Sequence, residues 1–238
     1  GKMPVNPGMI RSIVTSPMVD KICAKNGVKL DECLTGFKWI ANVMAGYEKT
    51  GSNNYIFGFE ESYGYNVETD VRDKDGVSAA AMCAEMTLYW RSVGKSLLER
   101  LEELYAEYGY YQDVAIAKNF PGSTGVETMK GIMANLRKDG LKSLGGKKVV
   151  KIRDVGQQII YDPANPDSKE KLDLPSSNVL QFFLDGGTVV SARPSGTEPK
   201  IKFYVNATVS VENGLDAAKK EANELCAAIE KEINAILD

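Results

Sequence analysis

Residues 28–64 read VKLDECLTGFKWIANVMAGYEKTGSNNYIFGFEESYG, and this stretch decides the fold of the first part of the chain. Its two ends, VKLDECL (28–34) and NYIFGF (54–59), have the branched and aromatic residues that are typical of strands. Between them, apolar side chains recur at the spacing of a helix that lies on a core. These side chains are Phe37, Ile40, Val43 and Met44. The stretch therefore predicts a strand, a helix and a strand in succession.

The residues before this stretch add one more strand and one more helix. The segment MIRSIVTS (9–16) is rich in β-branched residues and predicts a strand. We expect Ser16 to cap the following helix, with Pro17 at its first position and Gly27 at its end. The order is then strand, helix, strand, helix, strand, which indicates an α/β domain with a mostly parallel sheet.

Two loops follow strands of this predicted sheet. TGFK (35–38) follows the second strand, and EESYG (60–64) follows the third. Because ligands of parallel sheets bind beyond the carboxyl ends of the strands, we expect both loops to share one edge of the sheet.

Two further helices are predicted before the pattern changes. Residues 77–90, VSAAAMCAEMTLYW, are apolar on nearly every side, which is typical of a helix sandwiched within a domain. Residues 96–109 carry an apolar stripe on one face. We therefore expect the first domain to span residues 1–109.

Residues 110–238 predict an α+β domain with an antiparallel sheet and packed helices. Several short strands alternate apolar and polar residues, and Asp185-Gly186-Gly187 is a hairpin signal between two of them. Thr124 and Glu127 have the spacing of a capping box at the start of a helix. The polar, proline-containing segment 162–176 predicts a surface loop. A final helix has one apolar face, formed by Leu215, Ala218, Ala222, Leu225, Ile229, Ile233 and Ile236.

Composition limits the classes of function. With 238 residues the chain is long enough for two domains. A net charge of −3 offers no basic face for nucleic acid, so we expect no nucleic-acid partner. No apolar run approaches the roughly 18 residues of a membrane span, so we expect a cytoplasmic protein that does not bind membranes. The absence of histidine excludes histidine-based catalysis and zinc sites within this chain. The four scattered cysteines fit reduced, packed thiols. Because the sequence begins GKMPVNPGMI, with neither an initiator Met nor a signal peptide, we expect a fragment.

The stretch ARPSGTEPK (192–200) lies between two predicted strands. Pro194 and Gly196 favour a tight path that turns backbone N–H groups to one side, while Ser195 and Thr197 add hydroxyl donors and Arg193 adds a planar fork of N–H groups. On the local sequence alone, a phosphate cradle and a plain proline–glycine hairpin explain this pattern about equally well. Lys200 and Lys202 favour the cradle, because they lie on the polar side of the next predicted strand, whose apolar residues are Ile201, Phe203 and Val205.

The loop FGFEESYGY (57–65) and the segment DVRDKDG (70–76) also carry chemistry. Adjacent carboxylates can accept hydrogen bonds from sugar hydroxyl groups, although a solvated acidic loop is the simpler interpretation. Lys74 could donate or accept a proton, while the same segment also fits a turn that caps the next helix. A calcium loop is not expected, because Val71 occupies the first ligand position.

TGFKWI, FGFEESYGY, VRDKDG and RPSGTEPKIKFYV, in this order and spacing, resemble the carboxyl-terminal half of the α-D-phosphohexomutases, the phosphoglucomutase/phosphomannomutase family. The resemblance implies that Arg193, Ser195, Gly196 and Thr197 bind the substrate phosphate. It implies that Glu60 and Ser62 bind sugar hydroxyl groups, that Thr35, Gly36 and Lys38 contact the substrate, and that Lys74 is a general acid/base. Phe59 replaces the leading glycine of the family's sugar loop, and Tyr63-Gly64-Tyr65 resembles the phosphoglucomutase branch.

The family's phosphoserine loop, T-A-S-H-N-P, and its metal loop, D-x-D-x-D-R, do not occur in this sequence. The resemblance therefore implies domains three and four of a four-domain enzyme. The resemblance implies that the amino-terminal half of the same polypeptide, which is the partner of this chain, holds Mg²⁺, and that this chain binds no metal. It also implies that glucose 1,6-bisphosphate is the intermediate and activator. On this interpretation the fragment alone is inactive; the alternative is a free-standing sugar-phosphate-binding module.

Overall fold

The computed structural model describes residues 2–196 and 198–238. The chain divides into two units, Gly1–Gly109 and Tyr110–Asp238. The first is built on a mostly parallel sheet and the second on an antiparallel sheet with packed helices, so the predicted fold class is confirmed.

The first unit has a four-stranded sheet in the order β2-β1-β3-β4. Strand β1 (Pro7–Ser12) is parallel to β2 (Lys29–Cys33) and to β3 (Asn54–Glu60), whereas the short β4 (Gly64–Asn66) is antiparallel to β3. Helices α1 (Met18–Lys25) and α2 (Phe37–Thr50) connect the parallel strands, as the sequence predicts.

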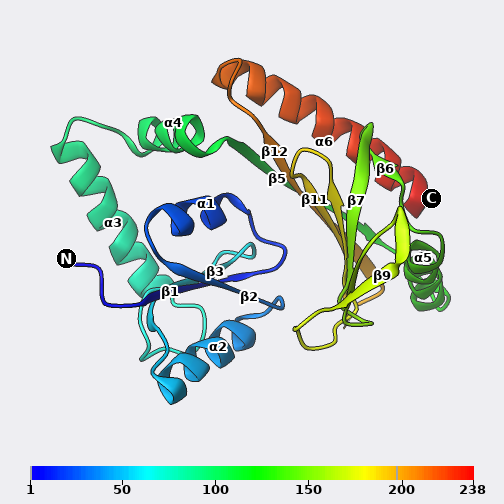
Figure 1. The fold of residues 1–238 in the computed structure, drawn as a ribbon, viewed down its shortest axis with the longest axis horizontal. Helices are drawn as coiled ribbons and strands as arrows, with labels where there is room; N and C mark the ends of the chain where they lie inside the picture. Colours follow the sequence, from blue (N-terminus) through cyan, green and yellow to red (C-terminus); the bar gives the residue numbers. More distant parts are fainter. Residues whose placement is uncertain (1, 197) are drawn as a thin grey trace. The chain divides into compact units, whose positions relative to one another are not determined.

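The two helices cover opposite faces of this sheet (Figure 1). Alternation along β1 explains this arrangement, because successive side chains of a strand point to opposite faces. Met9 packs with the cluster of α1 that contains Cys23, whereas Ile10 packs with Ile40 and Met44 of α2. The start of α1 differs from the prediction: Pro17, not Ser16, is the N-cap, and no side chain caps the helix.

Helix α3 (Gly76–Ser92) corrects the prediction of a sandwiched helix. None of its residues is buried, and Val77 and Leu88 are 82% and 70% exposed. Its main neighbours among the described elements are β4 and α4 (Leu97–Tyr108), which cover little of its surface. Its apolar residues lie on all sides, so the sequence shows that the helix is apolar but does not show what covers it.

The second unit is an eight-stranded antiparallel sheet with the path β5-β12-β11-β10-β7-β8-β9 and β6 paired to β7. Its strands are β5 (Tyr110–Asn119), β6 (Ser143–Leu144), β7 (Lys147–Asp154), β8 (Ile159–Asp162), β9 (Asn165–Lys171), β10 (Leu180–Leu184), β11 (Val189–Pro194) and β12 (Lys200–Val209). The predicted hairpin joins β10 to β11, and Gly186 and Gly187 take the positive φ angles that such a turn requires.

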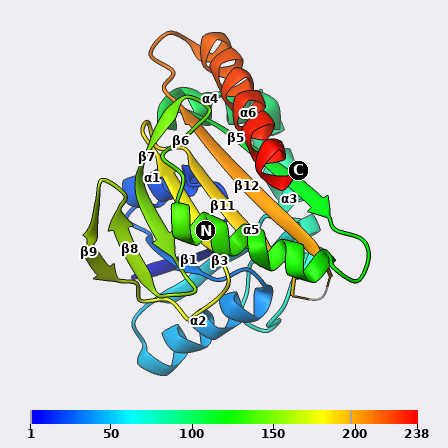
Figure 2. The same cartoon turned by 90° about the vertical axis from the view of Figure 1, so that its right-hand side faces the viewer.

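Helices α5 (Gly125–Asp139) and α6 (Leu215–Leu237) lie across one face of this sheet (Figure 2). Met133 from α5 and Ile229 from α6 join Phe182 and Phe203 of the sheet in one core. The apolar face predicted for the last helix is confirmed, since its members are buried or half-buried.

Two local predictions for the second unit are wrong. The predicted loop 162–176 contains β9, whose residues are all exposed; an edge strand that buries neither face shows no apolar alternation. Thr124 is the N-cap of α5 but its side chain makes no capping hydrogen bond, since its backbone already has helical angles. Within the described part of the chain, no helix has the length and apolarity needed to cross a membrane.

Candidate functional site

Glu60, the last residue of β3, contacts the loop that follows β2 on the other side of β1. Its side chain is only 6% exposed. One carboxylate oxygen accepts a hydrogen bond of 2.9 Å from the backbone N–H of Gly36, and the other lies 2.7 Å from Nζ of Lys74. The expected proximity of the two loops is therefore confirmed, and the lysine of a third segment joins them.

Lys74 connects this carboxylate to the following loop. Its ammonium group also donates a hydrogen bond of 2.9 Å to the backbone oxygen of Ser62. Gly64 makes the close approach possible, because a Cβ atom there would lie 2.9 Å from both Glu60 Cγ and Lys74 Cε. The segment that carries Lys74 also starts α3, since Asp75 accepts hydrogen bonds from the backbone of Val77 and Ser78.

A second layer of hydrogen bonds supports the loop from β1. Ser12, fully buried at the end of β1, donates to a carboxylate oxygen of Glu61 at 3.0 Å, and Ser62 donates to the other oxygen at 3.2 Å. The hydroxyl groups of Ser12 and Thr15 are 2.7 Å apart. Sequence analysis missed Ser12 and Thr15; the available signal was their position at the carboxyl end of a parallel strand.

Thr35 and Lys38 are less closely involved. Thr35 is half-buried just before Gly36. Lys38 is exposed at the start of α2, with its ammonium group 5.4 Å from the ring centre of Trp39. No hydrogen bond or ion pair between described residues joins Lys38 to Glu60 or Lys74, so the structure brings together Gly36, Glu60, Ser62 and Lys74 but leaves Lys38 outside this cluster.

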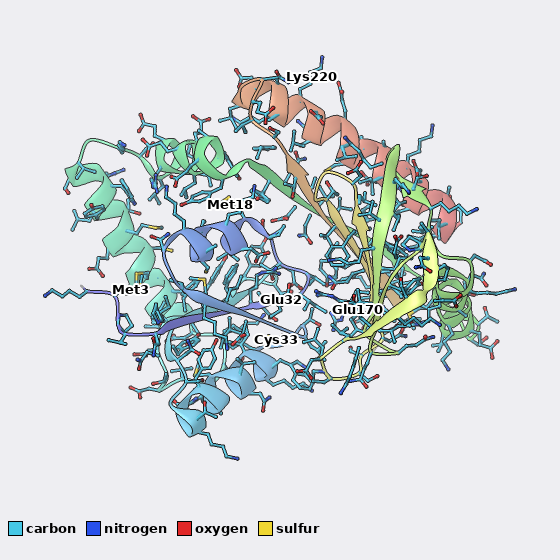
Figure 3. All side chains as sticks on the ribbon, viewed as in Figure 1. Met3, Met18, Glu32, Cys33, Glu170 and Lys220 are labelled. Carbon is cyan, nitrogen blue, oxygen red and sulfur yellow. The ribbon has the colours of Figure 1, made fainter. Side chains whose placement is uncertain are left out.

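Cys33 ends β2 at the same edge, next to Glu32 (Figure 3). Burial, together with the negative charges of Glu60 and Glu32, raises the pKa of the Cys33 thiol to about 12. The thiol is therefore protonated at neutral pH and is no nucleophile there.

In the second unit, β11 and β12 are joined by the loop that follows Arg193. The N–H of Ser195 donates to the oxygen of Lys200 at 2.7 Å, and the hydroxyl of Ser195 accepts a hydrogen bond of 3.3 Å from the N–H of Glu198. These bonds close the loop across its base. Thr197 lies outside the described residues.

A cavity of about 450 Å³ opens at this loop. Arg193, Ser195 and Gly196 line it together with residues from α5 and from the connection before β10. Three of the four predicted phosphate ligands therefore border one cavity, and the structure describes no position for the fourth.

Arg193 and Lys202 are directly opposite each other in the β11–β12 pair. Side chains at such positions share a face of the sheet, and like charges there repel. Ile201, Phe203 and Val205 of β12 are buried and Lys202 is half-exposed, as predicted, but Tyr204 and Asn206 are buried too, so the strand has buried residues on both faces. An anion bound between Arg193 and Lys202 would reduce the repulsion between their positive charges.

A metal centre does not fit the described residues. Among them, no three acidic or cysteine side chains are grouped closely enough to hold a metal ion. Glu60 is already engaged by a lysine and a backbone N–H.

Models of one protein family match both units of the chain. Residues 1–108 match the α/β/α domain III of phosphoglucomutase/phosphomannomutase, and residues 114–224 match the C-terminal domain of the same family. A phosphoglucomutase of Staphylococcus saprophyticus is 34% identical over 201 residues, a match that covers 84% of this chain and 36% of the relative. A phosphoglucomutase of Staphylococcus aureus strain MRSA252 is 36% identical over 198 residues, covering 83% of this chain and 35% of the relative.

A solved structure has the same fold. The open form of the exocytosis-sensitive phosphoprotein pp63/parafusin, a phosphoglucomutase from Paramecium, superposes with a TM-score of 0.57 at 22% identity, over 93% of this chain and 38% of that one. The chain thus spans little more than a third of the length of these relatives. With both of its units matched in order, the chain belongs to the phosphoglucomutase/phosphomannomutase family.

Proposed function

We propose that this chain is the substrate-binding part of a phosphohexomutase that interconverts hexose 1-phosphate and hexose 6-phosphate, with glucose favoured over mannose. The observation that carries the proposal is the cavity at the β11–β12 loop, which Arg193, Ser195 and Gly196 line. Lys202 adds a second positive charge directly opposite Arg193 in the strand pair. A guanidinium fork beside a serine hydroxyl group suits a phosphate, whichever carbon of the sugar bears it.

The first unit would bind the sugar. An ionised carboxylate offers about four acceptor positions, and Glu60 uses one on each oxygen, for Gly36 and Lys74. The remaining positions are available to hydroxyl groups of a hexose, and Ser62 adds a hydroxyl of its own. This arrangement supports the roles proposed for Glu60, Ser62 and Gly36; Thr35 and Lys38 would make outer contacts.

Lys74 would move a proton. An ammonium group has three donors, and two of them reach Glu60 and the oxygen of Ser62. The third can point at a substrate oxygen held by the same loop. A lysine so placed can serve as the general acid/base of phosphoryl transfer to and from the sugar.

The phosphoryl donor, Mg²⁺ and turnover of glucose 1,6-bisphosphate are assigned to the complete polypeptide, with the metal held by its amino-terminal half in the cytoplasm. Arg193, Ser195, Gly196 and Thr197 would hold whichever phosphate is not reacting. We expect this chain alone to bind hexose phosphates without interconverting them. Phosphorus NMR of glucose 1-phosphate with the chain should show no conversion, and conversion would contradict this part of the proposal.

The binding role is tested by titrating glucose 1-phosphate into the 238-residue chain by calorimetry. Loss of a charged, bidentate donor should weaken binding about tenfold or more in Arg193→Ala. Arg72→Ala is the control. Arg72 is an exposed arginine of the first unit, where it pairs with Glu48, so it does not belong to the unit that contains the cavity. Unchanged affinity in Arg193→Ala would overturn the assignment of the cavity.

A further inference from the structure

The cavity at the β11–β12 loop has a second wall that the family motif does not include. Helix α5 contributes Val126, Met129 and Lys130, and the connection between β9 and β10 contributes Ser177 and Asn178. Met129 is buried in the core of the second unit, which fixes this turn of α5 against the sheet. Lys130, the next residue, is exposed at the cavity.

The charge of the cavity is one-sided. Its described lining residues carry two cationic side chains, Arg193 and Lys130, and no carboxylate. No ion pair between described residues neutralises Lys130. The cost of holding two cations around one cavity falls when an anion occupies it, and a phosphate dianion matches both charges.

Asn178 is held in a defined orientation by Arg137 of α5. Nη2 of Arg137 donates to Oδ1 of Asn178 at 2.6 Å, and Nε of the same side chain donates to Oδ2 of Asp154 at 3.0 Å. Asp154 is only 3% exposed, and its other oxygen accepts hydrogen bonds from the backbone N–H groups of Gly156 and Gln157. Arg137 is therefore fixed by a buried, fully engaged carboxylate.

This network decides which end of the Asn178 amide is free. Because Oδ1 accepts from Arg137, the NH₂ group is the part without a partner among the described residues, and Asn178 lines the cavity. A side-chain amide donor at an anion cavity adds a directed hydrogen bond to the two charges.

We propose that Lys130 and Asn178 form a second wall of the phosphate site, and that Arg137 is a positioning residue that presents the Asn178 amide. Lys130 supplies a cation and Asn178 a neutral donor to the oxygens of the phosphate that the β11–β12 loop leaves uncovered. The ligand class is the phosphate group of a hexose phosphate, so this inference rests on the proposed function and extends it.

The test uses inorganic phosphate and glucose 1-phosphate, titrated into the full 238-residue chain by calorimetry at constant ionic strength. Lys130→Met should weaken both ligands about tenfold. Lys138→Met is the matched control, because Lys138 lies on the same helix but does not line this cavity, and it should leave affinity unchanged. Equal affinity in the Lys130 variant and the control would overturn the role of Lys130.

The positioning role needs a readout that a purely structural residue would not move. Arg137→Lys keeps a cation for Asp154, but an ammonium group lacks the planar fork that joins Asp154 to Asn178. It should therefore weaken phosphate as much as Asn178→Ala does, about threefold to tenfold, while urea unfolding changes little. The double variant should lose no more than either single one, since both remove the same contact. Additive losses, or a loss in Arg137→Lys that only tracks unfolding, would overturn the role of Arg137.

Failure of this inference can be told from failure of the proposed function. If Arg193→Ala loses phosphate while variants of Lys130 and Asn178 keep it, the second wall is wrong and the proposed function stands. If the unsubstituted chain binds neither phosphate nor glucose 1-phosphate, the proposed function itself fails, and the second wall fails with it.

Discussion

At the scale of single residues, Lys74 stabilises a carboxylate that is otherwise removed from water. Among the described residues, the polar partners of the two oxygens of Glu60 are the N–H of Gly36 and the ammonium group of Lys74. Removing one partner of a buried ion pair leaves the other charge uncompensated, which costs about 3–5 kcal/mol when both are buried. The ammonium group of Lys74 is partly exposed, so the cost here is smaller.

We predict that Lys74→Met lowers the free energy of unfolding of the first unit by about 1–3 kcal/mol. Urea unfolding followed by tryptophan fluorescence measures it. Arg72→Met is the matched control, because the Arg72–Glu48 pair is exposed on both sides and such pairs contribute about 0–1 kcal/mol. Equal losses in both variants would show that Glu60 is effectively solvated.

Tyr63 is held in an unfavourable backbone conformation. Its φ angle is +53°, in the left-handed region, and its side chain is 88% exposed, so the ring contributes little packing that would offset the strain. Asn tolerates this region better than other side chains. Tyr63→Asn should therefore raise the free energy of unfolding by about 0.5–1 kcal/mol, measured in urea, whereas Tyr63→Phe should leave it unchanged. A destabilised Asn variant would indicate that the ring makes a stabilising contact.

For the cluster of Gly36, Glu60, Ser62 and Lys74, the sequence predicts which residues take part but only some of the contacts between them. That Glu60 and Gly36 lie at one edge follows from their positions after two parallel strands of the same sheet, β3 and β2, which flank β1. The pairing of Glu60 with Lys74 could not be predicted in this way, because it depends on β4 turning back at Gly64. Only a residue without a Cβ atom leaves room there for both side chains. Asn178 and Lys130 could not be predicted, since nothing local relates them to the distant β11–β12 loop.

At the scale of elements, α3 is an apolar helix with little cover from the described part of the chain. It carries Cys83, which is exposed, whereas Cys23, Cys33 and Cys226 are buried. Burial raises the pKa of each of these three thiols, so they are also poorly ionised at pH 8.

We predict that a thiol reagent at pH 8 modifies Cys83 rapidly and the other three cysteines only after denaturation. Mass spectrometry of native and urea-unfolded protein measures the sites. Cys83→Ser provides the control, and its native form should take up almost no reagent. Slow modification of Cys83 in the unsubstituted chain would show that another surface, such as that of a second copy, covers α3.

Elements with one clear apolar face were predictable, and elements without one were not. Helix α6 buries the face that its spacing indicates, and β12 buries Ile201, Phe203 and Val205 at alternate positions. Strand β9 has no buried face, so its polar sequence looks like a loop. The prediction that α3 is buried is wrong for the opposite reason. Its apolar residues lie on all sides, and periodicity does not distinguish a buried apolar helix from an exposed one.

At the scale of the whole molecule, each unit has its own core. Ile40 and Met44 belong to a core of the first unit, whereas Phe182 and Phe203 belong to that of the second. Trp39 and Trp90, the two tryptophans of the chain, both lie in the first unit. Tryptophan fluorescence therefore reports unfolding of the first unit alone, while calorimetry reports both.

This asymmetry allows phosphate binding to be assigned to one unit without any label. A ligand that binds only the folded state stabilises it by about 2.7 kcal/mol at a hundred times its dissociation constant. Since the proposed phosphate site lies entirely in the second unit, we predict that saturating inorganic phosphate raises a calorimetric transition by several degrees and leaves the fluorescence transition in place. Arg193→Ala should abolish the calorimetric shift, and sodium chloride at equal ionic strength controls for screening by salt. If the fluorescence transition rises as much as the calorimetric one, either the units unfold as one cooperative body or phosphate binds the first unit. The Arg193 variant separates these cases, because it removes the fluorescence shift only in the former.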